Sequence, residues 1–144
     1  MKVHDEMISA LDIQGDTVLT SSPDSTIKIT NFVKGLTSDA QSEDCPETPA
    51  YGIPDVEKTN ITVQVSKTIP LKCKGCSFVK VRPDGKLLVA AGWDGGLRFY
   101  SWSKAKFLGL IEAHSPDTIT DMFLFDNKII CSGRDHKISF WTMY

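Results

Sequence analysis

The sequence predicts an all-β chain built from repeats of one antiparallel unit, and three observations support this. One pattern recurs three times: a β-branched or leucine run, small residues, an aspartate, and apolar residues three and five positions later. Apolar and polar residues alternate around each aspartate, which is the two-residue period of a half-buried strand. No segment shows the 3.6-residue period of an amphipathic helix. Each unit is therefore expected to be strand, tight turn, strand.

The three copies align on their aspartates, Asp24, Asp94 and Asp135. The apolar residues three and five positions later fall on one face of a strand, because side chains alternate; they are Ile27, Ile29, Leu97, Phe99, Ile138 and Phe140. A further alternating run precedes each copy and ends in a turn sequence of residues that accept turn geometry at low cost. These turns are Gln14-Gly15-Asp16, Pro83-Asp84-Gly85 and Asp126-Asn127. Each copy is therefore predicted to be a three-stranded meander followed by a fourth strand.

The spacing of the copies indicates a known repeat architecture. Asp94 and Asp135 are 41 residues apart, within the period of about 40–45 residues of four-stranded propeller blades. The third copy also has His114, 21 residues before Asp135, and Trp141, six residues after it. This set resembles the WD40 family, in which such a histidine, aspartate and tryptophan join a serine or threonine in a buried hydrogen-bonded set. Ser132 is the predicted hydroxyl, and the resemblance implies a partial WD40-type β-propeller of about three blades, each a four-stranded antiparallel sheet.

A histidine, an aspartate and a serine together also fit a hydrolase. The set recurs in part in the first copy, as His4 and Asp24, and the Gly-x-Ser-x-Gly turn of a serine hydrolase is absent. A polar group at a buried turn is costly unless it is paired, so the set is predicted to be structural and no catalytic residue is assigned. The middle copy has Lys74-Gly75 in place of the histidine and Tyr100 in place of the tryptophan, and the first copy has Thr30 in that slot. Those two copies are expected to rely more on apolar packing and on their neighbours.

The first two aspartates are 70 residues apart, and the excess over one repeat lies in residues 33–60. This segment has six acidic residues, two lysines and three prolines, so it cannot bury enough apolar surface to offset its ordering entropy. It is predicted to be a disordered acidic loop, either a solvated insertion or a partner-binding or phosphorylated segment. The predicted blades are residues 1–32 with 61–72, residues 73–113, and residues 114–144, in which the last strand is missing.

Three blades do not close a ring, because propellers have about four to eight. An open set of blades exposes apolar flanks, since each blade buries its faces against its neighbours. The chain is therefore expected to be a fragment, a truncated product, or part of a propeller completed by another chain, with the total blade number open. An N-terminal strand of the complete protein is predicted to pair beside Ile138–Trp141.

Composition argues against several classes of function. The net charge of -2 provides no field to attract nucleic acid or an anionic membrane. The longest apolar run, Leu87–Gly92, is far shorter than the roughly 20 residues of a membrane helix, and the N-terminus lacks the apolar core of a signal peptide. Cys73 and Cys76 have the spacing of half a zinc site, but no second pair at ligand spacing completes it. No metal and no cofactor are therefore predicted, and the cysteines are expected to be reduced, small apolar residues.

An ordered series of motifs in the second and third copies narrows the family. It comprises Val79-Lys-Val-Arg-Pro-Asp-Gly-Lys, Ala91-Gly-Trp-Asp94 with Leu97-Arg-Phe99, His114-Ser, and the terminal Asp135-His-Lys-Ile-Ser-Phe-Trp-Thr-Met-Tyr144. Over residues 76–144 this series resembles the C-terminus of the ASTRA-associated protein 1 family, which includes the animal G-protein β-subunit-like protein 1. The resemblance implies a nuclear scaffold of the ASTRA assembly, linked to chromatin regulation, with the cytoplasm open as a second compartment. It also implies association with the co-chaperone complex that matures phosphatidylinositol-3-kinase-related kinases.

The predicted function is therefore non-enzymatic protein scaffolding. The alternative among binding modules is a generic WD40 adaptor, for instance a phosphopeptide reader with Arg82, Arg98 or Arg134 as charge-assisted donors. An enzyme of propeller fold would need a convergent polar cluster in its central channel. The sequence offers no paired carboxylates or metal-ligand set for such a cluster.

Overall fold

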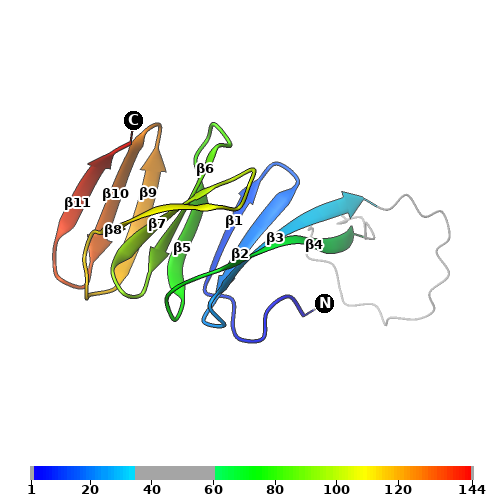
Figure 1. Ribbon diagram of the computed structural model, residues 1–144, viewed down its shortest axis with the longest axis horizontal. Helices are drawn as coiled ribbons and strands as arrows, with labels where there is room; N and C mark the ends of the chain where they lie inside the picture. The colour runs from blue at the N-terminus through cyan, green and yellow to red at the C-terminus, as the bar shows by residue number, and fades with distance from the viewer. Residues whose placement is uncertain (1, 35–60, 144) are drawn as a thin grey trace, which may run out of the picture.

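The computed structural model describes residues 2–34 and 61–143, and all the regular elements in these ranges are strands. Three antiparallel sheets lie side by side (Figure 1). The first sheet contains β1 (Ala10–Gln14), β2 (Thr17–Ser22), β3 (Thr26–Lys34) and β4 (Ile61–Pro70), and the second contains β5 (Cys76–Val81), β6 (Leu87–Gly92), β7 (Gly96–Ser101) and β8 (Phe107–Glu112). The third contains β9 (Ile119–Phe125), β10 (Lys128–Gly133) and β11 (Ile138–Thr142). The all-β prediction is confirmed.

The strand order in each sheet follows the chain, so each sheet is a simple meander. In the first sheet β3 and β4 pair as far as Lys34 and Ile61, the two residues that flank the gap in the described chain. Residues 35–60, which make up most of the predicted acidic loop, lie outside the described residues. None of the described residues belongs to a helix of the length and hydropathy that would cross a bilayer.

The core is divided into two apolar clusters, one on each face of the second sheet. Alternation along β6 directs Leu88 and Ala90 into the cluster shared with the first sheet, and Val89 and Ala91 into the cluster shared with the third. The four residues are completely buried, and a strand buried on both faces is expected to read as a continuous apolar run. The second sheet is therefore covered on both faces by its neighbours.

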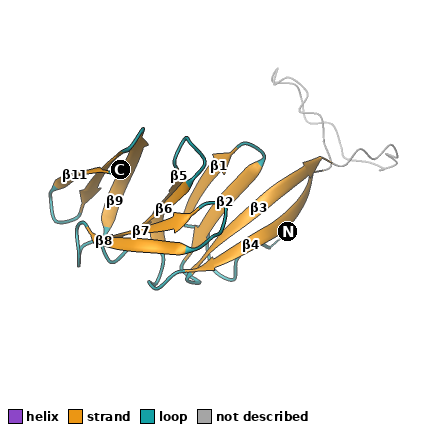
Figure 2. Ribbon diagram, turned by 45° about the horizontal axis from the view of Figure 1, so that its top comes forward, coloured by secondary structure: helices purple, strands orange, loops and turns teal. Residues whose placement is uncertain are grey.

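The innermost strands β1, β5 and β9 join the sheets to one another (Figures 1 and 2). The carboxylate of Asp12 on β1 accepts hydrogen bonds from the backbone N–H of Val81 (3.0 Å) and from Lys80 Nζ (2.9 Å), both on β5. The hydroxyl of Ser9 donates to the carbonyl of Cys76 at 2.7 Å. These polar contacts fix the register between the first two sheets, which apolar packing alone leaves free to slide.

The third sheet has one apolar face that no described residue covers. Its exposed side chains are Phe123, Phe125, Ile138 and Phe140, which we call the open face. Ile138 is 65% exposed, whereas Ile27 and Leu97, which occupy the same position of the repeat in the other two sheets, are 0% exposed. The same position of the repeat is therefore covered by a neighbouring sheet in the first two sheets, and no described residue covers it in the third.

Candidate interaction surface at the turn-aspartate end

The hairpins that carry Asp24, Asp94 and Asp135 lie at the same end of the three sheets, the lower edge in Figure 1, which we call the turn-aspartate end. The residue after each aspartate, Ser25, Gly95 or His136, has a positive φ of 61–75°. Its N–H donates to the carbonyl three residues earlier at 3.1–3.3 Å. This is the type I turn followed by a left-handed residue that is common in three-residue hairpin loops.

The aspartates stabilise these turns by a bond that is the same in all three. One carboxylate oxygen accepts the backbone N–H two residues on, from Thr26 at 3.0 Å, Gly96 at 3.3 Å and Lys137 at 3.2 Å. This arrangement is an Asx turn, for which aspartate is suited because its short side chain reaches its own backbone. Each carboxylate can accept further hydrogen bonds from within the sheet, and each copy provides its own donor for them.

In the third sheet Asp135 is one end of a hydrogen-bonded chain of four side chains. His114 Nδ1 lies 2.9 Å from an Asp135 carboxylate oxygen, and its Nε2 lies 2.9 Å from Ser139 Oγ. Trp141 Nε1–H donates to the same hydroxyl at 3.0 Å. Because a carboxylate can only accept, Nδ1 carries the proton, and Nε2 then accepts the proton of Ser139. The histidine side chain is 1% exposed, and both of its ring nitrogens have partners within the set.

The hydroxyl of this set belongs to Ser139, and the assignment to Ser132 is wrong. Ser132 points to the opposite side of β10, where its hydroxyl lies 3.0 Å from that of Thr120. Successive residues of a strand alternate between faces, so the residue next to Ser132, Cys131, faces the histidine instead. Ser139 is the cross-strand partner of Cys131. The signal that identifies it is its place two residues before Trp141, on the same face of β11.

The first sheet also has a complete histidine-centred set. His4 Nδ1 lies 2.8 Å from Asp24, and His4 Nε2 lies 2.8 Å from Thr20 Oγ1. Thr20 is on β2, directly across from Lys28, just as Cys131 is across from Ser139 in the third sheet. The same hydroxyl is therefore supplied from the opposite strand of the hairpin. The expectation that this copy relies more on apolar packing and on its neighbours did not include this set, whose hydroxyl comes from Thr20.

The second sheet replaces the histidine by an arginine. Arg98 binds Asp94 with both terminal nitrogens, at 2.9 and 2.5 Å, and its side chain is 6% exposed. Arg98 comes four residues after its turn aspartate, the position that Lys28 and Ser139 occupy in the other two copies. Hydrogen bonds from Arg98 lower the pKa of Asp94, and a Cβ atom added at Gly92 would collide with both charged groups. A bidentate ion pair between the buried Arg98 and the half-exposed Asp94, rather than packing alone, therefore holds this turn.

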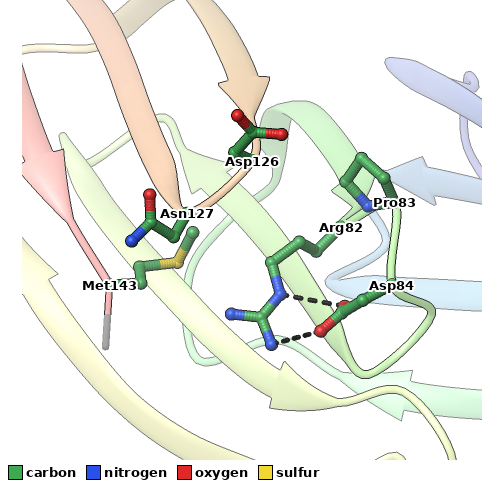
Figure 3. Close-up of a pocket in the computed structure, with 6 residues that line it drawn as sticks. All are labelled: Arg82, Pro83, Asp84, Asp126, Asn127 and Met143. Atoms are coloured by element: carbon green, nitrogen blue, oxygen red, sulfur yellow. Dashed lines mark hydrogen bonds and ion pairs between the residues drawn. The ribbon is translucent and has the colours of Figure 1, made fainter.

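These pairings decide which of the three candidate arginines is available to a ligand. Arg98 is committed to Asp94. Arg82 donates to Asp84 from Nε at 2.9 Å and from a terminal nitrogen at 2.6 Å, beside a hollow of 610 Å³ at the opposite end of the sheets (Figure 3). Arg134 is exposed and forms no ion pair with any residue in the described ranges. Arg134 is therefore the candidate that remains for recognition.

Arg134 lines a hollow of 420 Å³ at the turn-aspartate end, between the innermost strands, which we call the inner groove. Trp93 lines it from the neighbouring hairpin, and both residues directly precede a turn aspartate. The other lining residues come from the segment before β1 and from the starts of β5 and β9; they are Met7, Ile8, Ser9, Ser77, Phe78, Thr118, Ile119 and Thr120. Sequence reasoning identified Arg134 but not the groove, because its residues are far apart in the chain.

The cysteine pair lies beside this end and is packed as apolar side chains. Cys76 is 0% exposed within the first apolar cluster, and burial raises its pKa to about 12. Burial also raises the pKa of Cys73, whose thiol donates to the Gly75 carbonyl. A raised pKa disfavours the thiolate that metal binding and thiol exchange require. In the described ranges no three His, Cys, Asp or Glu side chains are placed to hold a metal ion.

Comparisons with known proteins agree with this architecture. The family model described as "WD domain, G-beta repeat" matches residues 66–101 and 105–142, about half of the chain. Guanine nucleotide-binding protein subunit beta-like protein 1 of Mus musculus is 35% identical over 83 residues, which are 58% of this chain and 26% of that protein. ASTRA-associated protein 1 of Schizosaccharomyces pombe is 35% identical over 77 residues, 51% of this chain and 21% of that protein. ASTRA-associated protein 1 of Schizosaccharomyces japonicus is 34% identical over 71 residues, 49% of this chain and 20% of that protein.

The matches confirm the resemblance inferred from the motif series, at modest identity over about half the chain. This chain spans about a quarter or less of the length of these relatives. The comparisons therefore support the repeat architecture and the similarity to these relatives, and they do not assign an activity or a partner.

Ser139→Ala is expected to lower the free energy of unfolding by about 1–3 kcal/mol, because it leaves His114 Nε2 and Trp141 Nε1 without a partner. Ser132→Ala is the matched control, with an expected change below about 0.5 kcal/mol, since its hydroxyl bonds only the exposed Thr120. Urea unfolding of both variants measures the difference. A larger loss for Ser132→Ala would contradict the assignment of the hydroxyl to Ser139.

Asp24 is expected to make stability depend on pH in the acid range. Burial alone would raise the pKa of Asp24, but hydrogen bonds from Thr26 and His4 outweigh it and hold the pKa at about 2, below the ordinary value of 3.8. A carboxylate with a depressed folded-state pKa stabilises the fold above its unfolded pKa, and that contribution is lost as pH falls through the folded pKa.

The stability deficit of Asp24→Asn relative to the natural chain should therefore be largest above about pH 4 and should shrink as pH falls toward 2. Chemical unfolding between pH 2 and 7 measures it, with the exposed Asp16→Asn as control. A deficit that is constant across this range would show that the Asp24 carboxylate is not held ionised by its partners.

Proposed function

Because this chain belongs to the WD40 family, we propose that it is a non-enzymatic scaffold that binds partner proteins through the inner groove at its turn-aspartate end. One observation carries the proposal. The buried polar groups of this end are saturated by one another, while Trp93, Met7 and Arg134 are left exposed around a hollow. Rigid turns that present exposed apolar and cationic side chains suit binding of a partner.

The saturation of the polar sets supports a structural rather than a chemical role for them. A serine nucleophile needs a hydroxyl that is free to reach a substrate and a histidine that accepts its proton. The Ser139 hydroxyl instead accepts a hydrogen bond from Trp141 Nε1–H and donates one to His114 Nε2. The histidine side chain is almost fully buried. The resemblance of this trio to a hydrolase triad is therefore one of composition only.

The proposed assembly is ASTRA, acting with the co-chaperone complex that matures phosphatidylinositol-3-kinase-related kinases, in the nucleus and in connection with chromatin. The cytoplasm is the second proposed compartment. Two relatives named ASTRA-associated protein 1 support this assignment. Direct contact with nucleic acid or a membrane is not part of the proposal, because a net charge of -2 favours neither.

A complementary set of blades is the second proposed partner, in the same chain or in another. The open face supports this, because Ile138 and Phe140 are 65% and 72% exposed at positions that are buried in the first sheet. Apolar faces of this kind are templates for association. The proposed cover is a further WD40-type sheet packed as the second sheet packs on the first.

The second candidate function is that of a generic WD40 adaptor, including a phosphopeptide reader of another complex. The unpaired guanidinium of Arg134 is the observation that favours it. Arg82 and Arg98 are not candidates for phosphate binding, because each already forms a bidentate ion pair, with Asp84 and Asp94 respectively.

Affinity purification of the tagged protein from nuclear and cytoplasmic extracts, followed by mass spectrometry, tests the assignment. Recovery of ASTRA subunits and the kinase-maturation co-chaperone is expected, mainly from the nuclear extract. Trp93→Ala should reduce this recovery, whereas Lys104→Ala, exposed on the β7–β8 loop at the opposite end, should leave it unchanged. Recovery of an unrelated complex through the same groove would support the generic adaptor and would overturn the ASTRA assignment.

A further inference from the structure

The inner groove is elongated along the innermost strands. A second hollow of 280 Å³ shares Ser9, Ser77 and Phe78 with it and continues along β1, β5 and β9 toward Met122. The two hollows therefore form one depression that follows the strand direction. An extended peptide segment has the shape that fits such a depression, whereas a compact ligand would fill only one part of it.

The apolar side chains of the groove are exposed, and the backbone that carries Trp93 is fixed by hydrogen bonds. Met7 is 70% exposed, Ile8 48% and Trp93 37%. The backbone of Trp93 is anchored on both sides, since its N–H donates to the Gly75 carbonyl at 3.2 Å and its carbonyl accepts from Thr118 Oγ1 at 2.8 Å. A large aromatic side chain on a fixed backbone loses little conformational entropy when it binds.

The backbone of Gly75 lies beside the indole of Trp93. Gly75 has a φ of 151°, and a Cβ atom there would lie 3.4 Å from two indole carbons of Trp93.

The side chain of the residue before each turn aspartate takes no part in the Asx turn. Proline, tryptophan and arginine occupy it in the three copies, as Pro23, Trp93 and Arg134, so the fold leaves its side chain free for recognition.

The hollow of 420 Å³ carries a single charged side chain among the described residues. This side chain is that of Arg134, whose backbone N–H donates to the Thr118 carbonyl at 3.0 Å. The adjoining hollow adds Lys80, which is paired with Asp12, and Asp121, which accepts the N–H of Met122. The guanidinium is thus the one strong donor without a counter-charge along the described walls of the groove.

A lone guanidinium suits a carboxylate better than a phosphate. Arginine and a carboxylate form two parallel hydrogen bonds and neutralise each other. A phosphorylated side chain carries close to two charges and is ordinarily bound by a cluster of arginines. The hydroxyl of Ser77, which bonds no other described side chain or backbone group, provides one further neutral donor on the groove wall.

We propose that the inner groove binds an extended peptide segment in which an aspartate or glutamate side chain pairs with Arg134 and a neighbouring bulky apolar side chain packs against Trp93. This deepens the proposed scaffold function and rests on it, because it specifies the chemistry that the partner presents. It does not depend on which complex supplies the segment.

Selection of a random heptapeptide library on the purified protein tests this proposal. Enriched peptides should contain an acidic residue within two positions of an aromatic or large aliphatic one. Arg134→Glu should abolish that enrichment and replace it by lysine or arginine at the acidic position. Lys86→Glu, exposed on the β5–β6 turn at the opposite end, is the charge-matched control and should retain the natural preference.

Synthetic copies of the most enriched peptide then separate the possible anions. The peptide with glutamate should quench Trp93 fluorescence, a signal that is missing in Trp93→Phe, and the peptide with glutamine in its place should bind at least tenfold more weakly. Phosphoserine that binds more tightly than glutamate would overturn the proposal in favour of a phosphopeptide reader. Enriched peptides without an acid, or glutamine bound as well as glutamate, would overturn it outright.

Two controls keep the outcomes interpretable. Thermal unfolding of Arg134→Glu should match that of the natural protein, because the side chain is exposed and unpaired; an acid preference that survives in a folded Arg134→Glu protein would overturn the proposal. Failure of the ASTRA assignment is read separately, from the affinity purification. An acidic peptide preference without ASTRA subunits would refute that assignment and support the groove chemistry.

Discussion

Burial of both faces of each sheet is the constraint on which this molecule depends. A β-sheet with two apolar faces is stabilised by each further layer that covers one of them. The second sheet satisfies this condition through the alternation of Leu88 and Ala90 with Val89 and Ala91, which divides β6 between two clusters. The first and third sheets satisfy it on one face. Stacking follows directly, and stacking brings three hairpins of the same design to the same end of the molecule.

The three hairpins show that one turn tolerates different polar solutions as long as no buried group is left without a partner. The aspartate and its Asx bond are constant. The inward partner is histidine with threonine in the first sheet, arginine in the second, and histidine with serine and tryptophan in the third. Because these networks stabilise the turns, the side chain of the residue before each aspartate is not needed to hold the turn. The inner groove is made where two such residues, Trp93 and Arg134, meet the starts of the innermost strands.

Local pattern in the sequence predicted the strands, the turns and the aspartates, because a two-residue period and turn-forming residues are local properties of the chain. It placed Ser132 in the polar set and did not identify Thr20 and Arg98 as partners in the turns, because those assignments depend on which residues face each other across a hairpin. The Cα pairing of Thr20 with Lys28, Ala90 with Arg98 and Cys131 with Ser139 marks one cross-strand site in all three sheets. The groove was beyond prediction, since its residues meet only after three sheets have stacked.

Hydrogen–deuterium exchange of the chain alone is the most direct test of this stacking. Amide protection follows the local free energy of opening, so β6, which is covered on both faces, should exchange more slowly than any strand of the third sheet, whose open face is uncovered. The paired central strand β10 is the fair comparison, because both β6 and β10 have hydrogen-bonded strands on each side. Slower exchange in β6 than in β10 is the predicted result. Equal protection of the two strands would show that the third sheet needs no neighbour on its open face, and that burial of both faces is not the constraint that organises the fold.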